Sequence, residues 1–197
     1  MPTSIVIRAA VPADAPLIHA MIVELAVYER EPEAVAISEA DLLRDGWGEH
    51  PRFTCLVAED EAGVVCGFAL YHPTYSTWQG HSLYLEDLYV RATHRGRGVG
   101  TALLAEVASV AVAQGCARLD WQVLTWNEPA IRVYERIGAV RMEEWRRMRL
   151  SEDGLAVLAA QAMPRAAGSQ TGTPEENDSE RSRQQAVIHA RGTGGTL

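Results

Sequence analysis

The sequence predicts a single α/β (α+β) domain built on a mixed sheet, on three observations. The expected elements follow the order strand, two helices, three strands, helix, strand, helix, strand, helix. The early strands follow one another directly, which indicates antiparallel pairing, and the later strand–helix–strand order indicates a parallel crossover. The chain has 197 residues, of which 47% are hydrophobic, and this is enough to bury one substantial core.

The N-terminal part predicts one strand and two helices. Residues 5–7 are Ile-Val-Ile and form a short strand, and residues 12–28 repeat apolar side chains at helical spacing. A second helix is expected over residues 38–43 and is broken at Asp45-Gly46. Residues 47–51 are interpreted as a loop.

The middle of the chain predicts a hairpin followed by the central strand. Residues 53–59 and 64–71 are apolar runs joined by the polar turn Asp60-Glu61-Ala62-Gly63, which is typical of a hairpin. Residues 72–81 are expected to form a loop, and the central strand then runs to Val90.

The C-terminal half predicts an alternation of helices and strands. A helical stripe begins at Val99 and ends at Gly115, and a strand is expected over residues 119–125. Asn127 is a good N-cap for a helix that carries Pro129 in its first turn and ends at Gly138.

The end of the chain predicts one more strand, one more helix and a tail. The strand is expected over residues 145–150 and the helix over residues 151–162, with Ser151 as its cap. Residues 164–197 are polar and glycine-rich, which predicts a disordered tail. The folded domain is therefore expected to span residues 1–163.

Two neighbouring carboxylates in the central strand mark a change of phase. Apolar residues fall on odd positions at Leu83 and Leu85 and on even positions at Leu88 and Val90. Because one extra residue reverses the alternation of a strand, this pattern predicts a β-bulge at Glu86-Asp87. Bulges are frequent beside active sites, although a solvated pair of surface carboxylates would give the same sequence.

A turn rich in glycine and arginine lies between the central strand and the next helix. Glycines stand at positions 96, 98 and 100 and arginines at positions 95 and 97. Glycines let the backbone approach a ligand closely, and the free N–H groups of a helix N-terminus attract anions. The segment therefore predicts a binding site for a phosphate or a pyrophosphate.

Composition excludes several classes of function. The net charge of −8, in a chain without lysine, weighs against nucleic-acid binding. The N-terminus does not resemble a signal peptide, no apolar run is long enough for a membrane span, and three widely spaced cysteines suggest reduced thiols in the cytoplasm. The six histidines and three cysteines show no metal-ligand spacing, so no metal site is expected.

A series of further sequence blocks resembles one branch of a known superfamily. The segment Arg95-x-x-Gly98-x-Gly100 resembles the acetyl-CoA signature of the GNAT superfamily of N-acetyltransferases, and the other blocks resemble its spermidine/spermine (diamine) and thialysine branch. These blocks, within about residues 5–160, are Glu24-Leu25-Ala26, Tyr28-Glu29, Asp41-Leu42-Leu43, Asp45-Gly46, Gly48-Glu49-His50-Pro51, Leu56-Val57-Ala58-Glu59, Gly67-Phe68-Ala69, Tyr84-Leu85-Glu86-Asp87, Trp126-Asn127-Glu128-Pro129 and Gly138-Ala139. The resemblance implies the GNAT fold, with helices on both faces of the sheet and one strand–helix–strand unit that binds acetyl-CoA.

The resemblance also implies catalytic residues. An alkylammonium with a pKa near 10.4 is deprotonated in only about one molecule in a few thousand at neutral pH, so acetyl transfer to an amine needs a base. The resemblance implies Glu86 as that base, with Asp87 holding the acceptor or orienting water. It implies Tyr134 as the acid that protonates the coenzyme A thiolate, although a tyrosine on an apolar helix face is also an ordinary core residue.

The resemblance also implies residues that bind acetyl-CoA and residues that bind the acceptor. The acetyl-CoA set consists of Leu88, Tyr89, Val90, Arg95, Gly96, Arg97, Gly98, Val99, Gly100, Thr101, Asn127, Pro129, Ala130 and Tyr134. The acceptor set consists of Tyr28, Glu29, Trp78, Glu86, Asp87, Glu144 and Trp145, joined by Trp121 and Gln122 on their position alone. Aromatic faces and carboxylates suit ammonium groups.

The sequence thus predicts an acetyl-CoA-dependent N-acetyltransferase that acts by direct attack on a primary amine of a small, polyamine-like substrate. One alternative acceptor is thialysine or another lysine-like amino acid, whose carboxylate would need an arginine such as Arg132, Arg146 or Arg147. Acetylation of proteins and a non-catalytic acetyl-CoA-binding module also stay open. The resemblance further implies a homodimer with the C-terminal strand at its interface, and no nucleic-acid or membrane partner is expected.

Overall fold

The computed structural model describes residues 5–163, which fall into two compact units that divide after Arg141. Each unit is described by itself. The elements are β1 (Val6–Ala9), η1 (Pro12–Asp14), α1 (Ala15–Tyr28), η2 (Pro32–Ala34), α2 (Glu39–Trp47), β2 (Thr54–Glu59), β3 (Val65–Ser76), β4 (Gly80–Val90), η3 (Ala92–His94), α3 (Val99–Ala113), β5 (Leu119–Trp121), α4 (Glu128–Arg136) and α5 (Glu152–Ala159), where η marks a short 3-10 helix.

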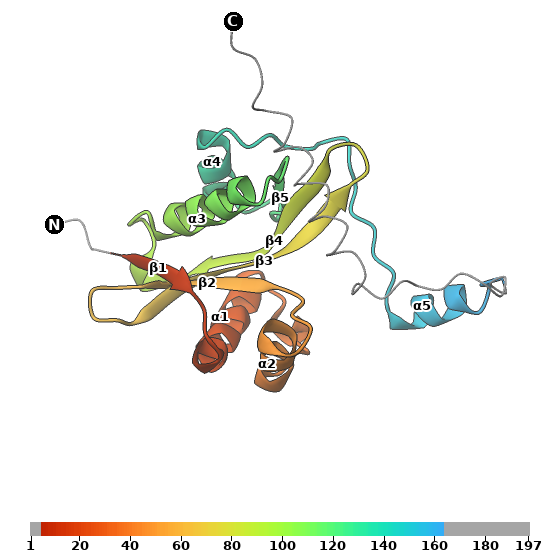
Figure 1. Cartoon of the computed structure of the whole chain (residues 1–197), viewed down its shortest axis with the longest axis horizontal. Helices are drawn as coiled ribbons and strands as arrows, with labels where there is room; N and C mark the ends of the chain where they lie inside the picture. Colours follow the sequence, from red (N-terminus) through yellow and green to blue (C-terminus); the bar gives the residue numbers. More distant parts are fainter. Residues whose placement is uncertain (1–4, 164–197) are drawn as a thin grey trace, which may run out of the picture. The chain divides into compact units, whose positions relative to one another are not determined.

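The first unit is built on a five-stranded sheet in the order β1-β2-β3-β4-β5 (Figure 1). Neighbouring strands from β1 to β4 are antiparallel, and β5 pairs parallel to β4 after the crossover through α3. The predicted mixed sheet, with antiparallel strands followed by one strand–helix–strand unit, is confirmed.

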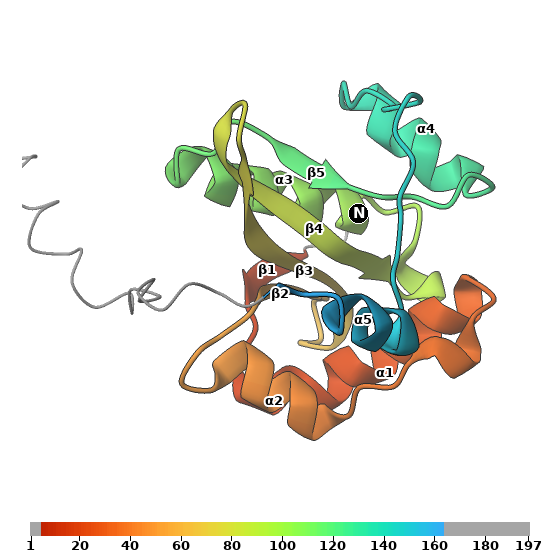
Figure 2. The same cartoon turned by 90° about the vertical axis from the view of Figure 1, so that its right-hand side faces the viewer.

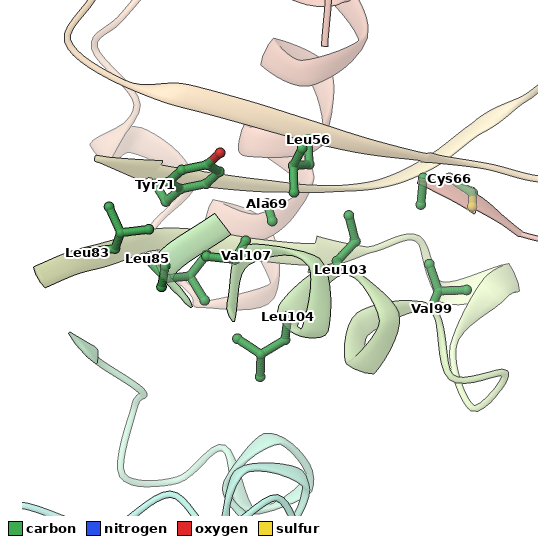
Figure 3. Packing of buried hydrophobic residues seen from close by; sticks show 12 residues of the cluster. Leu56, Cys66, Ala69, Tyr71, Leu83, Leu85, Val99, Leu103, Leu104 and Val107 are labelled. Atoms are coloured by element: carbon green, nitrogen blue, oxygen red, sulfur yellow. The ribbon is translucent and has the colours of Figure 1, made fainter. Parts of the chain in front are cut away.

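Helices cover both faces of this sheet, as predicted (Figure 1). On the α1–α2 face, a buried cluster joins Met21 of α1 to Phe68 of β3. On the α3 face, Leu103 of α3 packs with Leu83 of β4 (Figure 3). Tyr134 of α4 is partly buried and packs against the same cluster. Each of these large apolar side chains contributes about 1.5–3 kcal/mol when fully buried, so the sheet is a firm base with a separate layer on each side.

The helix α2 begins with a capping box. Asp41 Oδ2 accepts the Ser38 N–H at 2.9 Å, and Ser38 Oγ accepts the Asp41 N–H at 3.2 Å. Arg44 then donates to Asp41 at 2.6 Å and to Asp45 at 2.7 Å on the same helix surface. These bonds hold the helix together as far as its C-terminal turn.

The same helix continues past the predicted break. Asp45 and Gly46 are helical, and α2 ends at Trp47. A Cβ on Gly46 would lie 2.8 Å from the Phe53 ring, so glycine here makes room for that ring. The predicted break at Asp45-Gly46 is therefore wrong, because tertiary packing explains a glycine that looked like a helix breaker.

The hairpin of β3 and β4 is also longer than predicted. His72 stands opposite Tyr84 and Ser76 opposite Gly80, so most of the expected loop over residues 72–81 is paired strand. A hydrogen bond of 2.9 Å joins the hydroxyls of Thr74 and Ser82 across the hairpin. The loop prediction is wrong except for the turn at residues 77–79, because the cross-strand partners compensate for the polar sequence.

The predicted strand over residues 119–125 is shorter in the structure, since β5 covers Leu119–Trp121. The predicted strand over residues 145–150 is wrong, because no strand forms there. A strand needs a neighbour for its N–H and C=O groups, and none of residues 5–163 pairs with that segment.

The second unit contains α5, which confirms a helix after Ser151. Ser151 has an extended backbone at the N-cap position but makes no capping bond through its side chain, so its predicted capping role is corrected. The predicted disordered tail, residues 164–197, lies outside the described residues. The domain boundary at residue 163 stays a prediction.

Candidate active site

The predicted β-bulge lies in β4. Leu70 of β3 stands opposite Asp87, and Tyr71 stands opposite Leu85, so Glu86 is the extra residue of the pairing. Leu85 before the bulge and Leu88 after it both pack in the cluster on the α3 face. The predicted phase slip is confirmed, and it turns both Glu86 and Asp87 toward the α1–α2 face.

The two carboxylates line an open hollow of about 240 Å³ between α1, α2 and the sheet. Five apolar residues form its walls and five charged residues lie around it. These are Ile22, Ile37, Leu42, Phe53 and Leu70, and Asp41, Asp45, Arg52, Glu86 and Asp87. The site therefore offers apolar surface for an aliphatic chain and charges for its ends.

The two bulge carboxylates have different surroundings. Asp87 is half-buried, and burial, followed by the negative charges of Glu86 and Glu29, raises its pKa to about 6. The Glu86 side chain is 47% exposed, and its Oε2 lies 3.6 Å from Nε2 of His72. Asp87 is thus the better shielded of the two and has the pKa closer to neutral.

Glu29 follows α1 and acts on two other residues of the site. Burial raises its own pKa, and its negative charge helps to raise the pKa of both Asp87 and Tyr134. The neighbouring Tyr28 donates its hydroxyl to Oδ1 of Asn127 at 3.0 Å, which ties the end of α1 to the start of α4. Residues from three distant segments of the sequence are thereby brought together.

Tyr134 projects from α4 and is half-buried. Its ring packs edge-to-face on Trp121 of β5, with 5.1 Å between the ring centroids. Burial, followed by the charge of Glu29, raises the pKa of its phenol. Tyr134 therefore keeps its proton at neutral pH, as a proton donor must.

The start of α4 is set by its own sequence. Asn127 caps the helix, because its side chain accepts the Ala130 N–H at 3.4 Å, and Pro129 occupies the first turn. The N-cap prediction is confirmed.

The glycine turn between β4 and α3 has the expected backbone. Gly96 and Gly98 have φ angles of 74° and 84°, in the left-handed region, and Gly98 is the N-cap of α3. A Cβ on either residue would meet no protein atom within 4 Å. Open space thus borders the turn, and the N–H groups at the start of α3 suit a phosphate or a pyrophosphate.

The first turn of α3 and the arginines beside it are placed as follows. Val99 is buried, whereas Arg97 and Thr101 are exposed. The position of a Cβ on Gly100 is 3.6 Å from the Val90 side chain, so α3 starts close against β4. Arg95 donates its Nε to the Val90 carbonyl at 2.8 Å.

Arg95 is also braced by aromatic rings, since its guanidinium lies 4.8 Å from the Tyr28 ring centroid and 5.3 Å from that of Tyr89. In this geometry Arg95 stacks on the aromatic rings beside the turn.

Among the described residues, one edge of β4 has no strand partner beside the turn, although its Val90 carbonyl accepts a hydrogen bond from Arg95. The parallel strand β5 pairs with Leu83, Tyr84 and Leu85 and with no later residue among those described. Figure 2 shows β4 and β5 diverging beyond that point. The edge of residues 88–90 that faces away from β3 can therefore bond an extended ligand as a strand would.

Four predicted site residues are not among those that line the hollow. Trp78 is at the tip of the hairpin and is 84% exposed, and Gln122 is exposed after β5. Glu144 and Trp145 belong to the second unit, where both are exposed. These four positions stay predictions for acceptor binding.

Sequence reasoning missed Arg52 and Phe53 as residues of the hollow. They follow the block Gly48-Glu49-His50-Pro51, and their nearness to that block was the only available signal. Within residues 5–163, no group of histidine, cysteine, aspartate and glutamate is arranged to hold a metal ion. Within the same residues, no helix is long and apolar enough to cross a membrane.

A family model described as "Acetyltransferase (GNAT) family" matches residues 19–139, which include the bulge, the glycine turn and Tyr134. The chain belongs to the GNAT family. It is therefore an acetyltransferase by family, and the predicted superfamily is confirmed. GNAT acetyltransferases use acetyl-CoA.

Individual relatives point to the predicted branch. Thialysine N-epsilon-acetyltransferase of Sus scrofa is 40% identical over 166 residues, which cover 79% of this chain and 98% of the relative. Spermidine/spermine N(1)-acetyltransferase-like protein 1 of Homo sapiens is 36% identical over 162 residues, which cover 78% of this chain and 23% of the relative. An integron cassette protein from the mobile metagenome of V. cholerae matches with a TM-score of 0.65 at 28% identity, over 79% of this chain and 98% of that one.

Proposed function

We propose that this GNAT protein transfers the acetyl group of acetyl-CoA to the primary amine of a small aliphatic substrate by direct attack. The observation that carries the proposal is the Asp87 carboxylate, which is shielded at the bulge and lines the hollow. Its pKa of about 6 lies near neutral pH, where a general base is most effective.

The amine is activated at the bulge. The negative charges of Glu86 and Asp87 attract the ammonium group, and Asp87 accepts its proton, directly or through one water. We assign this step to Asp87 in place of Glu86 because Glu86 is half exposed and lies beside His72. The freed nitrogen then forms a bond to the acetyl carbon.

Other groups of the protein act on the acetyl carbonyl and on the leaving thiolate. A backbone N–H on the edge of residues 88–90 that faces away from β3 stabilises the oxyanion of the tetrahedral intermediate. When the bond between carbon and sulfur breaks, Tyr134 donates its proton to the sulfur. The new amide nitrogen loses its second proton to solvent, Asp87 releases the proton that it accepted, and the Tyr134 phenolate regains one. One proton is released overall, and the enzyme returns to its starting state.

The glycine turn holds the coenzyme. The N–H groups at the start of α3 bind the pyrophosphate, with Arg97 and Thr101 exposed beside them. Support comes from the open space beside Gly96 and Gly98. Asn127, Pro129 and Ala130 line the coenzyme where α4 begins.

Two acceptor classes are compatible with this chemistry, a polyamine and a lysine-like amino acid. One relative is named as a thialysine acetyltransferase, and another is named as a protein like the spermidine/spermine acetyltransferases. A homodimer stays a prediction from the resemblance, and a cytoplasmic location stays a prediction from the cysteine pattern and the N-terminal sequence. A non-catalytic acetyl-CoA-binding module is disfavoured, because such a module would need neither a shielded base nor a shielded phenol.

The test is an assay of acetyl transfer by the purified full chain to spermidine, putrescine, thialysine and lysine. The rate is measured from the release of the free thiol of coenzyme A. Tyr134→Phe should lower kcat by on the order of 10²-fold, while acetyl-CoA binding measured by calorimetry stays unchanged. Release of thiol with none of these amines would contradict the proposed reaction. Unchanged turnover in Tyr134→Phe would remove Tyr134 from the acid role.

A further inference from the structure

The hollow in front of Asp87 has the form expected for a short aliphatic chain with charged ends. Its walls include Ile22 of α1, Leu42 of α2 and Phe53, which precedes β2. Such walls favour methylene groups, which lose their contact with water when they pack there. The charged residues around the walls then determine which charges the two ends of the aliphatic ligand must carry.

The charges divide into two groups. At the bulge, Glu86 and Asp87 form a negative end, where the reacting ammonium group belongs. At the α2 end, Asp41 and Asp45 are both bonded by Arg44, at 2.6 and 2.7 Å. Two carboxylates at this end are therefore largely neutralised before any ligand arrives.

Arg52 adds a further positive charge at the α2 end. With Arg44 it balances the two carboxylates of α2, so this end has no net negative charge. Its guanidinium has no ion pair within 4 Å among residues 5–163, although its charge contributes to lowering the pKa of Asp45. Among the described residues, the side-chain donors of Arg52 at the edge of the hollow thus have no hydrogen-bond or ion-pair partner.

The backbone of Arg52 is held by its surroundings. Its backbone N–H donates to the Asp45 carbonyl at 2.6 Å, which ties the chain to the end of α2. The next residue, Phe53, packs edge-to-face on Trp47 with 6.1 Å between the ring centroids. A held backbone lowers the entropy lost when the side chain binds a ligand.

We infer that Arg52 binds a carboxylate of the acceptor, so that the acceptor is a lysine-like amino acid and Arg52 is the residue that distinguishes it from a polyamine. This inference rests on the proposed function. The planar guanidinium gives a carboxylate two parallel hydrogen bonds. Asp45, beside Arg52, accepts the α-ammonium group of the same amino acid.

A polyamine does not match this arrangement. Its second ammonium group would lie next to the exposed Arg52, and two positive charges repel each other. The other arginines considered from the sequence are less suitable. Arg132 already lies 3.9 Å from Glu128 on α4, and neither Arg146 nor Arg147 is among the residues that line the hollow.

The experiment compares two acceptors that differ only in the carboxylate, L-lysine and its decarboxylated analogue cadaverine. The wild-type chain should have a higher kcat/KM for lysine. Arg52→Gln should lower kcat/KM for lysine by roughly 10–100-fold and leave cadaverine unchanged or slightly better, since one charge-assisted carboxylate contact is lost. The pair ornithine and putrescine repeats the comparison with a shorter chain.

Arg118→Gln is the matched control. Arg118 is an exposed arginine bonded to Asp120 and Gln79, and it does not line the hollow. Arg118→Gln should leave the ratio of kcat/KM for lysine to kcat/KM for cadaverine unchanged. Thermal unfolding of each variant should confirm an intact fold.

Equal losses for lysine and cadaverine in Arg52→Gln, or a loss that follows Arg132→Gln instead, would overturn the role of Arg52 while leaving the acetyltransferase function intact. Faster wild-type turnover of cadaverine would also overturn it. Wild-type turnover of neither amine nor of any other aliphatic amine would overturn the proposed function as well.

Discussion

The glycine turn before α3 and the hollow on the α1–α2 face are assembled in opposite ways. The turn comes from one continuous stretch, residues 90–101, and offers mainly backbone N–H groups. The hollow takes side chains from α1, α2, the segment before β2, and the strands β3 and β4. A backbone site can bind the same anion in many proteins, whereas a side-chain site can be specific for one acceptor.

Electrostatics separates the two regions further. The turn relies on helix N–H groups and glycine conformations, which do not titrate. The hollow contains Asp87, whose pKa is raised to about 6, beside other carboxylates. The reaction should therefore depend on pH through the hollow, and coenzyme affinity should depend on backbone conformation at the turn.

The largest expected effect is on turnover in Asp87→Asn. Removing a general base typically costs 10²–10⁴-fold in rate, and kcat should fall within that range while the KM for acetyl-CoA changes little. Steady-state kinetics with both substrates varied measures this. Glu86→Gln is the matched control and should lose less than tenfold. A larger loss in Glu86→Gln than in Asp87→Asn would return the base role to Glu86.

Asp87→Asn should also stabilise the fold at high pH. The pKa of Asp87 is raised from 3.8 to about 6 in the folded chain, so its carboxyl favours folding below pH 3.8 and loses that contribution as the pH rises through about 6. Asp87→Asn avoids the buried charge and should gain about 2–3 kcal/mol at pH 8. This corresponds to a Tm higher by roughly 5–10 °C.

The gain in the free energy of unfolding of Asp87→Asn should shrink as the pH falls through 6 and disappear near pH 4. Calorimetric melting from pH 4 to pH 8 measures both ends of the range. A stabilisation that is equal at all pH values would show that the Asp87 charge is not its cause.

A smaller effect is expected at the glycine turn. Gly98 has a φ angle of 84°, and alanine in that conformation costs about 1–2 kcal/mol. Gly98→Ala should lower Tm by roughly 2–8 °C and raise the KM for acetyl-CoA by roughly tenfold, since the added methyl group also enters the open space beside the turn.

Gly63→Ala provides the comparison, because Gly63 has a φ angle of 75° and equally open surroundings in the turn between β2 and β3. It should lower Tm to a similar extent without changing the KM for acetyl-CoA. If both variants weaken acetyl-CoA equally, the loss reflects general destabilisation and not the anion site.

The smallest effect is expected for Gly46→Ala in the hollow. The new Cβ would lie 2.8 Å from the Phe53 ring, so the ring must shift. The gain in helix propensity of about 1 kcal/mol offsets part of the strain. The KM for the acceptor should rise roughly two- to fivefold, because the shifted Phe53 ring changes the shape of one wall of the hollow. A change confined to the KM for acetyl-CoA would contradict the placement of Phe53 in the acceptor site.

Sequence patterns predicted the features that depend on neighbouring residues. The bulge follows from the apolar phase around Glu86-Asp87, and the glycine turn follows from the residues before Val99. The cap of α4 follows from Asn127 and Pro129 for the same reason. Each of these structures is fixed by sterics and hydrogen bonds within a few residues.

Patterns failed where partners are distant in the chain. The break predicted at Gly46 disappears because the Phe53 ring packs against that helix. The expected loop after Tyr71 is strand because its hydrogen-bonding partner lies across the hairpin. The segment 145–150 has strand-like composition and no strand neighbour among the described residues.

The sequence by itself therefore determined the fold family, the pair of carboxylates at the bulge and the glycine turn before α3. Only the tertiary structure distinguished the shielded Asp87 from the exposed Glu86 and brought Arg52 to the same hollow. Shielding and charge balance depend on the side chains that several remote segments place around one point. Local sequence carries no record of those distances, and the chain acquires them only when it folds.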